Sequence, residues 1–221
     1  MTILRTFLAV ALALATSAAN AANLQISPPG MTLTPTQKVE SMRIKNAGSS
    51  PIKIQMRAFS WASDPQALAI GETIGEPTGN VRFGPAQFQI PPGGSQIVRV
   101  IRTAPDKPTE QAYRIVVSEL PGEAMVESGA QILLNYNLPL FYRPTGAQPV
   151  LKARWEGTKL VVSNSGQATA QLSALQVGGK PILMGLVGYV LPGSTMAFET
   201  ATPPAQIDIK VNGESRILST N

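Results

Sequence analysis

The sequence contains neither cysteine nor histidine among its 221 residues. Without cysteine no disulfide can staple the fold and no thiol nucleophile is available. Without histidine the chain lacks the most frequent general base near neutral pH and the commonest metal ligand. The 13 acidic residues are scattered among loops and strand ends, with no spacing that pairs two of them for catalysis. We therefore expect a protein that is not an enzyme, needs no cofactor or metal, and works through its surfaces.

Concentrated charge is also missing. The formal net charge is +5, and the 18 lysines and arginines are spread along the chain without forming a run. A nucleic-acid-binding surface would combine a basic stripe with aromatic residues. The charge distribution instead predicts that nucleic acid is not a partner.

One long apolar run stands at the N-terminus. Arg5 precedes a run that ends at Ala15, and the tripeptide Ala19-Asn20-Ala21 has the small-x-small form of a cleavage site. A membrane anchor is the competing interpretation, but the run is shorter than the roughly 20 apolar residues that a membrane span needs. We predict that residues 1–21 are a signal peptide and that the mature, exported chain begins near Ala22.

Short alternating runs separated by turn residues fill the rest of the chain, which has 19 glycines and 19 prolines. Two clear examples are SQIVRVIR at 95–102 and AYRIVVSEL at 112–120. Alternation at this spacing is typical of a β-sandwich, and no convincing amphipathic helix interrupts it. In the run that ends at Trp61, Phe59 and Trp61 fall on one face, which we interpret as the face of a buried strand.

The strand pattern restarts after the connector TGAQP at 145–149. Proline- and glycine-bearing connectors of this kind separate domains. The sequence thus predicts an all-β protein of two sandwich domains, 22–145 and 150–221. Because the second is small for a seven-stranded sandwich, we expect some of its strands to be short.

Three segments carry a resemblance to a known family: FQIPPGGSQIVRVIR, EQAYRIVVSELP and LPLFYRP. In this order and at these distances they resemble the periplasmic pilus-assembly chaperones of the chaperone–usher pathway. The resemblance covers the mature chain and is strongest over 88–144. It implies two immunoglobulin-like domains in a boomerang arrangement, a periplasmic location, pilin subunits and an outer-membrane usher as partners, and self-association of the free protein.

The resemblance also implies how the chain binds a pilin: the last strand of the first domain, about 129–142, is lent to the incomplete subunit. Donor-strand complementation of this kind is a recognised form of β-augmentation. Alternation places Ala130, Ile132, Leu134 and Tyr136 on one face, where they are expected to fill the groove of the subunit. Without the resemblance, the better interpretation is that this face packs against its own domain.

The family pattern is not complete at the end of that strand. Well-studied members anchor the C-terminal carboxylate of the pilin with an Arg on the first strand and a Lys before the LFYRP-like segment. Here Pro139 takes the place of the Lys, and Gly30 lies near the place of the Arg. Together with Arg114, this departure indicates the archaic (Csu-like) branch of the family.

Two arginines are candidates to replace the missing anchor. The strand around Arg114 should run antiparallel to the lent strand, which brings Arg114 close to the position of the missing Lys. Arg102 should end near the same point from the opposite sheet. The alternatives are an internal salt bridge of Arg114 with Glu110 or Glu119, and a solvated strand end for Arg102.

A different class of function is also open at this stage. A structural pilus subunit or adhesin built from immunoglobulin-like domains would share the sandwich pattern. Such subunits end in an incomplete domain and usually carry an N-terminal donor extension, whereas both sandwiches read as complete here. An exported hydrolase on a β-sandwich ranks behind both.

Overall fold

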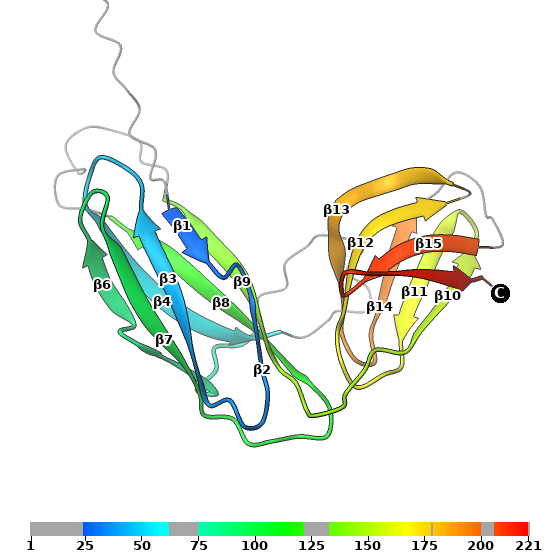
Figure 1. Cartoon of the computed structure of the whole chain (residues 1–221), viewed down its shortest axis with the longest axis horizontal. Helices are drawn as coiled ribbons and strands as arrows, with labels where there is room; N and C mark the ends of the chain where they lie inside the picture. The colour runs from blue at the N-terminus through cyan, green and yellow to red at the C-terminus, as the bar shows by residue number, and fades with distance from the viewer. Residues whose placement is uncertain (1–23, 62–74, 122–132, 178, 200–205, 221) are drawn as a thin grey trace, which may run out of the picture.

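A computed structural model describes residues 24–61, 75–121, 133–177, 179–199 and 206–220. The predicted signal peptide lies outside the described residues. In the described part the regular elements are strands, and they build two β-sandwiches joined at an angle (Figure 1). The predicted all-β fold with two immunoglobulin-like domains in a boomerang is thereby confirmed. Within these same ranges we find no helix that is long and apolar enough to cross a membrane.

The first domain packs a four-stranded sheet, with strand order β1-β3-β7-β5, against a five-stranded sheet, with order β2-β9-β8-β4-β6. Its strands are β1 (Leu24–Ser27), β2 (Met31–Leu33), β3 (Val39–Asn46), β4 (Ile52–Ser60), β5 (Val81–Gly84), β6 (Gln87–Ile90), β7 (Ser95–Arg102), β8 (Gln111–Leu120) and β9 (Asn135–Tyr142).

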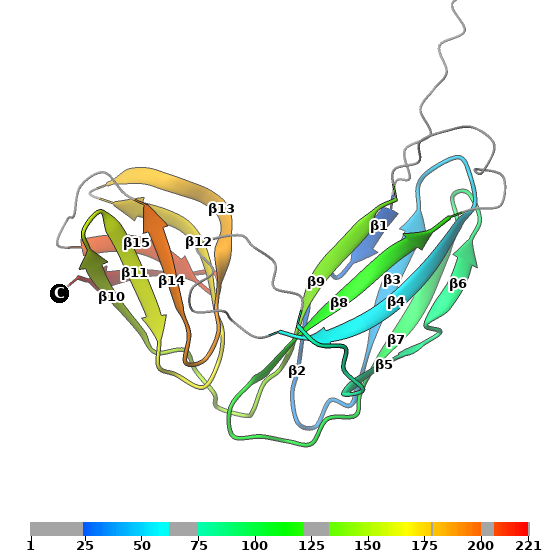
Figure 2. The same cartoon turned by 180° about the vertical axis from the view of Figure 1, so that it is seen from behind.

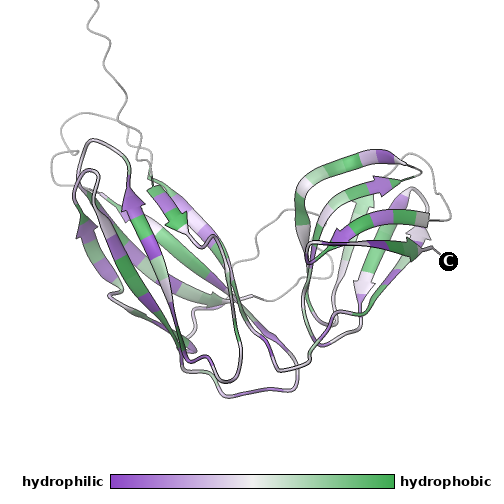
Figure 3. Cartoon of the chain, viewed as in Figure 1, coloured by the Kyte–Doolittle hydropathy of each residue, from purple (hydrophilic) through white to green (hydrophobic). Residues whose placement is uncertain are grey.

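Alternation along the strands produces the core between the two sheets, as the bands of colour along β3 and β7 illustrate (Figure 3). In β7, Val98 and Val100 are fully buried, whereas Arg99 between them is exposed. Burial of such aliphatic side chains stabilises the fold by roughly 1.5–3 kcal/mol each. The prediction that Phe59 and Trp61 mark a buried face was wrong: both are half-buried, and the residues of β4 that face the core are Ile52, Ile54, Met56 and Ala58.

The first strand changes sheets within a few residues. β1 pairs antiparallel with β3, and after Pro28-Pro29-Gly30 the chain crosses over so that β2 pairs parallel with β9. Proline has no backbone N–H to continue a ladder, so this tripeptide ends one pairing and allows the next. Because β2 pairs only with Leu140–Tyr142, no described strand lies beside the first half of β9 on that side.

The second domain packs a three-stranded sheet, order β10-β11-β14, against a four-stranded sheet, order β13-β12-β15-β16. Its strands have 5 to 11 residues, whereas strands of three and four residues occur in the first domain, so the expectation that the small second domain has short strands was wrong. The strands of the second domain are β10 (Leu151–Glu156), β11 (Lys159–Asn164), β12 (Ala170–Val177), β13 (Lys180–Val190), β14 (Thr195–Glu199), β15 (Gln206–Val211) and β16 (Glu214–Ser219).

Each domain contains the same buried asparagine corner. Asn46 ends β3 and donates its side-chain amide to the carbonyl of Ile90, at 3.2 Å. Asn164 ends β11 and donates in the same way to the carbonyl of Val190, at 2.9 Å. In both corners the side-chain oxygen accepts the N–H of the glycine two residues later. These amides satisfy strand ends in the interior, where unpaired polar groups would be costly.

Candidate functional site

β9 is the strand that the sequence predicts to be lent to a subunit. It runs along the side of the first domain that faces the second domain in both views (Figures 1 and 2). β8 pairs with β9 over its whole length, from Asn135 to Tyr142. The parallel partner β2 covers only the last three residues, so the edge from Asn135 to Pro139 is open in the described part of the chain.

The backbone of β9 shows which groups face this edge. Just before the strand, the carbonyl of Leu134 accepts the N–H of Glu119 at 3.0 Å. Since bonded pairs alternate in an antiparallel ladder, Tyr136 and Leu138 direct their backbone groups to β8, and Asn135 and Pro139 direct theirs to the open edge. Pro139 therefore occupies a position where the missing N–H removes no bond to β8, as is usual for proline in an edge strand.

The predicted donor residues are distributed between the strand and the chain before it. Ala130 and Ile132 lie outside the described residues. Leu134 is half-buried immediately before β9, and Tyr136 packs against the core of its own domain with its hydroxyl 3.4 Å from the carbonyl oxygen of Leu24. In the free chain Tyr136 thus makes the internal contact that the sequence left as the alternative. The contact of these residues with a subunit stays a prediction.

The two positions at which the family cations are missing lie in direct contact. A Cβ atom placed on Gly30 would lie 2.8 Å from Cγ of Pro139 and 3.3 Å from its carbonyl oxygen. Such distances leave no room for a side chain at residue 30 without displacing β9. The close approach of Gly30 and Pro139 explains in steric terms why glycine suits the crossover between β1 and β2.

Arg114 lies directly opposite Pro139 in the β8–β9 register. The predicted position of this arginine, close to the place of the missing Lys at Pro139, is confirmed: Arg114 lies on the neighbouring strand. Its guanidinium carbon is 3.4 Å from the centroid of the Trp61 ring. Of the two carboxylates considered as its partners, Glu110 binds Arg143, and Glu119 makes a long contact of 3.5 Å with the N–H of Leu134.

Trp61 belongs to an aromatic cluster that joins the two domains. Its ring centroid lies 5.7 Å from that of Phe141 on β9 and 5.4 Å from that of Tyr189 on β13, the latter at an interplanar angle of 77°. Phe141 and Tyr189 are themselves 5.7 Å apart. Tilted and edge-to-face arrangements at these distances are favourable for aromatic pairs. Arg114 therefore lies at the junction of the domains. The sequence pattern did not indicate its aromatic neighbours there.

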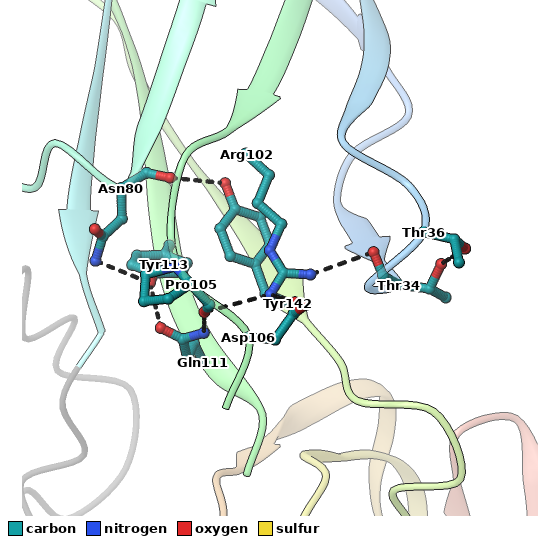
Figure 4. A network of polar contacts seen from close by, with 9 residues as sticks. All are labelled: Thr34, Thr36, Asn80, Arg102, Pro105, Asp106, Gln111, Tyr113 and Tyr142. Carbon is teal, nitrogen blue, oxygen red and sulfur yellow. Dashed lines mark hydrogen bonds and ion pairs between the residues drawn. The ribbon is translucent and has the colours of Figure 1, made fainter. Parts of the chain in front are cut away.

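Arg102 lies in a different and more enclosed environment (Figure 4). Its side chain is only 2% exposed, and it forms an ion pair with Asp106 at 2.5 Å. The guanidinium also lies 4.8 Å from the centroid of Tyr142 and donates to the carbonyl of Thr34 at 3.3 Å. The alternative of a solvated strand end was wrong, because the following loop returns Asp106 to cover it. Arg102 ties together β7, β9 and the end of β2.

Two buried tyrosines complete this network. The hydroxyl of Tyr142 donates to the carbonyl of Asn80 at 3.2 Å, and the amide of Asn80 donates to the hydroxyl of Tyr113 at 3.1 Å (Figure 4). Burial raises the pKa of Tyr142 far above its usual value, the neighbouring Tyr113 raises it further, and Arg102 opposes the rise. Burial also raises the pKa of Tyr113, against the hydrogen bond from Asn80. Both phenols are therefore held in the neutral form.

A buried carboxylate bridges the domains at the base of the bend. Glu110 precedes β8, and its fully buried carboxylate accepts a hydrogen bond from Nε of Arg143, which directly follows β9. The other carboxylate oxygen accepts the N–H of Thr169 in the second domain at 2.9 Å, and the N–H of Glu110 donates to the carbonyl of Gln167. Sequence reasoning missed this bridge, although a charge inside the otherwise apolar segment LPLFYRP could have indicated it.

A second apolar surface lies on β13, an edge strand of the four-stranded sheet in the second domain. Four of its large hydrophobic side chains are between 40% and 72% exposed: Ile182, Leu183, Met184 and Leu186. The alternation pattern alone does not indicate that these apolar residues remain at the surface.

Comparison with known proteins was made for the sequence and for the fold. Residues 23–148 match the family model described as pili and flagellar-assembly chaperone, PapD N-terminal domain. A search of curated proteins gave no sequence match.

Three solved structures illustrate the likeness of the fold. The CsuC–CsuE chaperone–tip subunit pre-assembly complex from the archaic Csu pili of Acinetobacter baumannii matches with a TM-score of 0.70 and 24% identity, covering 90% of this chain and 98% of that chain. The E. coli chaperone DraB matches with a TM-score of 0.69 and 19% identity, covering 90% and 96%. The Salmonella enterica SafA pilin in complex with the SafB chaperone gives 0.69 and 22%, covering 91% and 97%.

Proposed function

The chain belongs to the family of pili and flagellar-assembly chaperones, and from this premise we propose that it binds pilin subunits in the periplasm by lending them a strand. The predicted signal peptide at 1–21 supports the location. In this proposal the protein delivers each subunit to an outer-membrane usher and acts without nucleotide, metal or cofactor. The chaperone is released when a strand of the next subunit takes the place of the lent strand.

The observation that carries the proposal is the open edge of β9 from Asn135 to Pro139. A strand edge that has no neighbouring strand is a template for another strand, and proteins normally cover or interrupt such edges. A subunit that lacks its final strand can pair here through main-chain hydrogen bonds, with side-chain pockets that supply specificity. When no subunit is present, association of two copies through the same edge would protect it.

The side chains proposed to enter the subunit are Ala130, Ile132, Leu134 and Tyr136. Burying Ile132 or Leu134 completely would contribute roughly 1.5–3 kcal/mol each. Leu134 is half-buried in the free chain and so has surface left to bury. Tyr136 already packs against its own core, so its gain on binding would be smaller.

Arg114 is proposed to bind the C-terminal carboxylate of the subunit. It lies opposite Pro139, at the end of the open edge, and a guanidinium can present two parallel N–H groups to a carboxylate. Arg102 was the second candidate, but reaching a subunit would require it to break its ion pair with Asp106. We therefore assign Arg102 a structural role, and we propose Arg114 as the anchor from its position beside Pro139.

From the same features we propose that the chain belongs to the archaic branch of the family. The direct contact of Gly30 with Pro139 replaces both cations of the better-known branch, and Arg114 supplies a positive charge from the neighbouring strand. The fold resembles that of an archaic complex, the CsuC–CsuE assembly. The feature on which this proposed branch depends is a positive charge on β8, that of Arg114, in place of charges on β2 and β9.

Co-expression with a pilin encoded beside this chain tests the strand-donation proposal. We expect the pilin to remain soluble and protease-resistant only when the chaperone is present. Leu134→Asp should weaken their association about 10-fold or more, since a charge would enter the subunit groove. Asn135→Asp, the adjacent position on the opposite face, is the matched control and should have little effect. Polymerisation of this chain itself would instead indicate a structural subunit.

Pull-down of the same pilin tests the anchor. Arg114→Ala should reduce the amount of pilin retained, whereas Arg57→Ala should not. Arg57 is a suitable control because it stands on the neighbouring strand β4 and also lies over an aromatic ring, that of Phe59, at 5.6 Å. Equal retention by both variants would remove the anchoring role from Arg114.

A further inference from the structure

Trp61 lies in close contact with the guanidinium of Arg114. The guanidinium carbon lies 3.4 Å from the ring centroid, within the range of stacking contact. Trp61 follows the last residue of β4, and its N–H donates to the carbonyl of Ala112 on β8 at 3.0 Å. This hydrogen bond fixes the backbone of Trp61 to the strand that carries Arg114.

The ring of Trp61 is held from both domains. Phe141 contacts it from β9, and Tyr189 contacts it edge-on from the second domain. A side chain with this many partners has few rotamers available, so the surface it offers to Arg114 is rigid. A long arginine side chain loses rotamer entropy when it is ordered, and stacking on a rigid ring causes that loss before a ligand arrives.

Stacking also determines which part of the guanidinium can bind a ligand. One face of the planar group is covered by the indole ring, whereas the N–H groups of a guanidinium lie in its plane, which the ring face does not cover. A carboxylate binds in that plane through two parallel hydrogen bonds. The aromatic face thus orders the cation without competing for the groups that recognise the anion.

We propose that Trp61 is the positioning residue for the subunit anchor: it holds the guanidinium of Arg114 in the orientation that receives a terminal carboxylate at the junction of the two domains. This inference rests on the proposed function, in which Arg114 binds that carboxylate. It adds to the site the residue that directly follows β4 and, through Tyr189, makes the site depend on the docking of the second domain.

The test uses the mature full-length chain with the peptide N-acetyl-Ala-Val as a probe, either with a free carboxylate or as the C-terminal amide. Binding is followed by NMR through the side-chain Nε–H of Arg114. We expect the wild type to bind the carboxylate more tightly than the amide. Trp61→Leu should weaken carboxylate binding about 3- to 10-fold, in line with a lost cation–π contact, and leave amide binding unchanged. Trp61→Phe should recover part of the difference, because phenylalanine offers a smaller face.

Two results separate the failure of this inference from failure of the anchor itself. If Trp61→Leu binds the carboxylate as tightly as the wild type, or lowers only the melting temperature while the preference for the carboxylate persists, Trp61 is a structural residue and the inference is overturned. If the wild type does not prefer the carboxylate, or Arg114→Leu keeps the preference, the anchor is wrong. Should Trp61→Leu fail to fold, unchanged binding by Trp61→Phe overturns the inference.

Discussion

Replacing Glu110 with alanine should separate the two domains and destabilise the fold. The carboxylate of Glu110 is fully buried and joins three parts of the chain: its own loop, Arg143 directly after β9, and Thr169 in the second domain. After the substitution, the guanidinium of Arg143 loses its partner and the N–H of Thr169 loses its acceptor. No other contact of the same kind connects these three segments among the described ion pairs.

The expected cost follows from the burial of each partner. Removing one member of a buried ion pair costs about 3–5 kcal/mol, since the remaining charge is left uncompensated. Arg143 is 29% exposed, so water can reach it and reduce the cost. The orphaned N–H of Thr169 adds about 1–3 kcal/mol when it is buried without an acceptor. We therefore expect a loss of about 3–5 kcal/mol, which lowers the melting temperature of a chain of this size by roughly 6–20 °C.

Thermal unfolding monitored by circular dichroism measures this loss, and small-angle X-ray scattering measures the angle between the domains. Glu110→Ala should lower the melting temperature and broaden the distribution of shapes. Glu156→Ala is the matched control, because its ion pair with Arg154 is about half exposed on both sides and should be worth less than about 1 kcal/mol. If the two variants melt within a degree of each other and scatter alike, the reasoning about the bridge is refuted.

Three further predictions concern stability. Asn164→Ala should cost about 2–4 kcal/mol in chemical denaturation, because it leaves several buried backbone groups without partners; a cost below about 0.5 kcal/mol would contradict the role of the asparagine corner. Gly30→Ala should lower the melting temperature, since its Cβ would overlap the ring of Pro139, and Pro139→Ala in the same chain should restore part of the loss. Burial raises the pKa of Tyr142, so its contribution to the free energy of unfolding should be fully present below about pH 10 and fall at higher pH, where the phenol ionises in the unfolded chain first. Tyr142→Phe should reduce the loss of stability with rising pH, and an unchanged loss in this variant would contradict the role of Tyr142.

Individual strands could be predicted from the sequence because alternation with a period of two is a local property. The runs 95–102 and 112–120 correspond to β7 and β8 almost to the residue. The change of sheets between β1 and β2 was not predicted. The run from Met31 reads as one strand of seven residues, yet only three of them pair, since the partner that limits β2 is a strand more than 100 residues later in the sequence.

The part of the candidate site that depends on the pairing of β8 with β9 could be predicted from the sequence. Antiparallel pairing of two recognised strands predicted that Arg114 lies close to Pro139, and in the structure the two residues are direct partners. The contact of Arg114 with Trp61 and that of Trp61 with Tyr189 join distant segments, so neither strand periodicity nor composition could reveal them. Arg102 is buried because of a loop conformation, and loops leave no periodic signal in a sequence.

Hydrogen exchange of backbone amides tests the central claim, that a subunit pairs with the open edge of β9. The amide of Asn135 points to this edge and should exchange rapidly in the free chain. In the complex with its pilin we expect that amide to become protected, while amides on β13, the exposed edge strand of the second domain, keep their rates. Protection that appears on β13 and not on β9, or a complex in which Asn135 exchanges as fast as in the free chain, would contradict strand donation by β9.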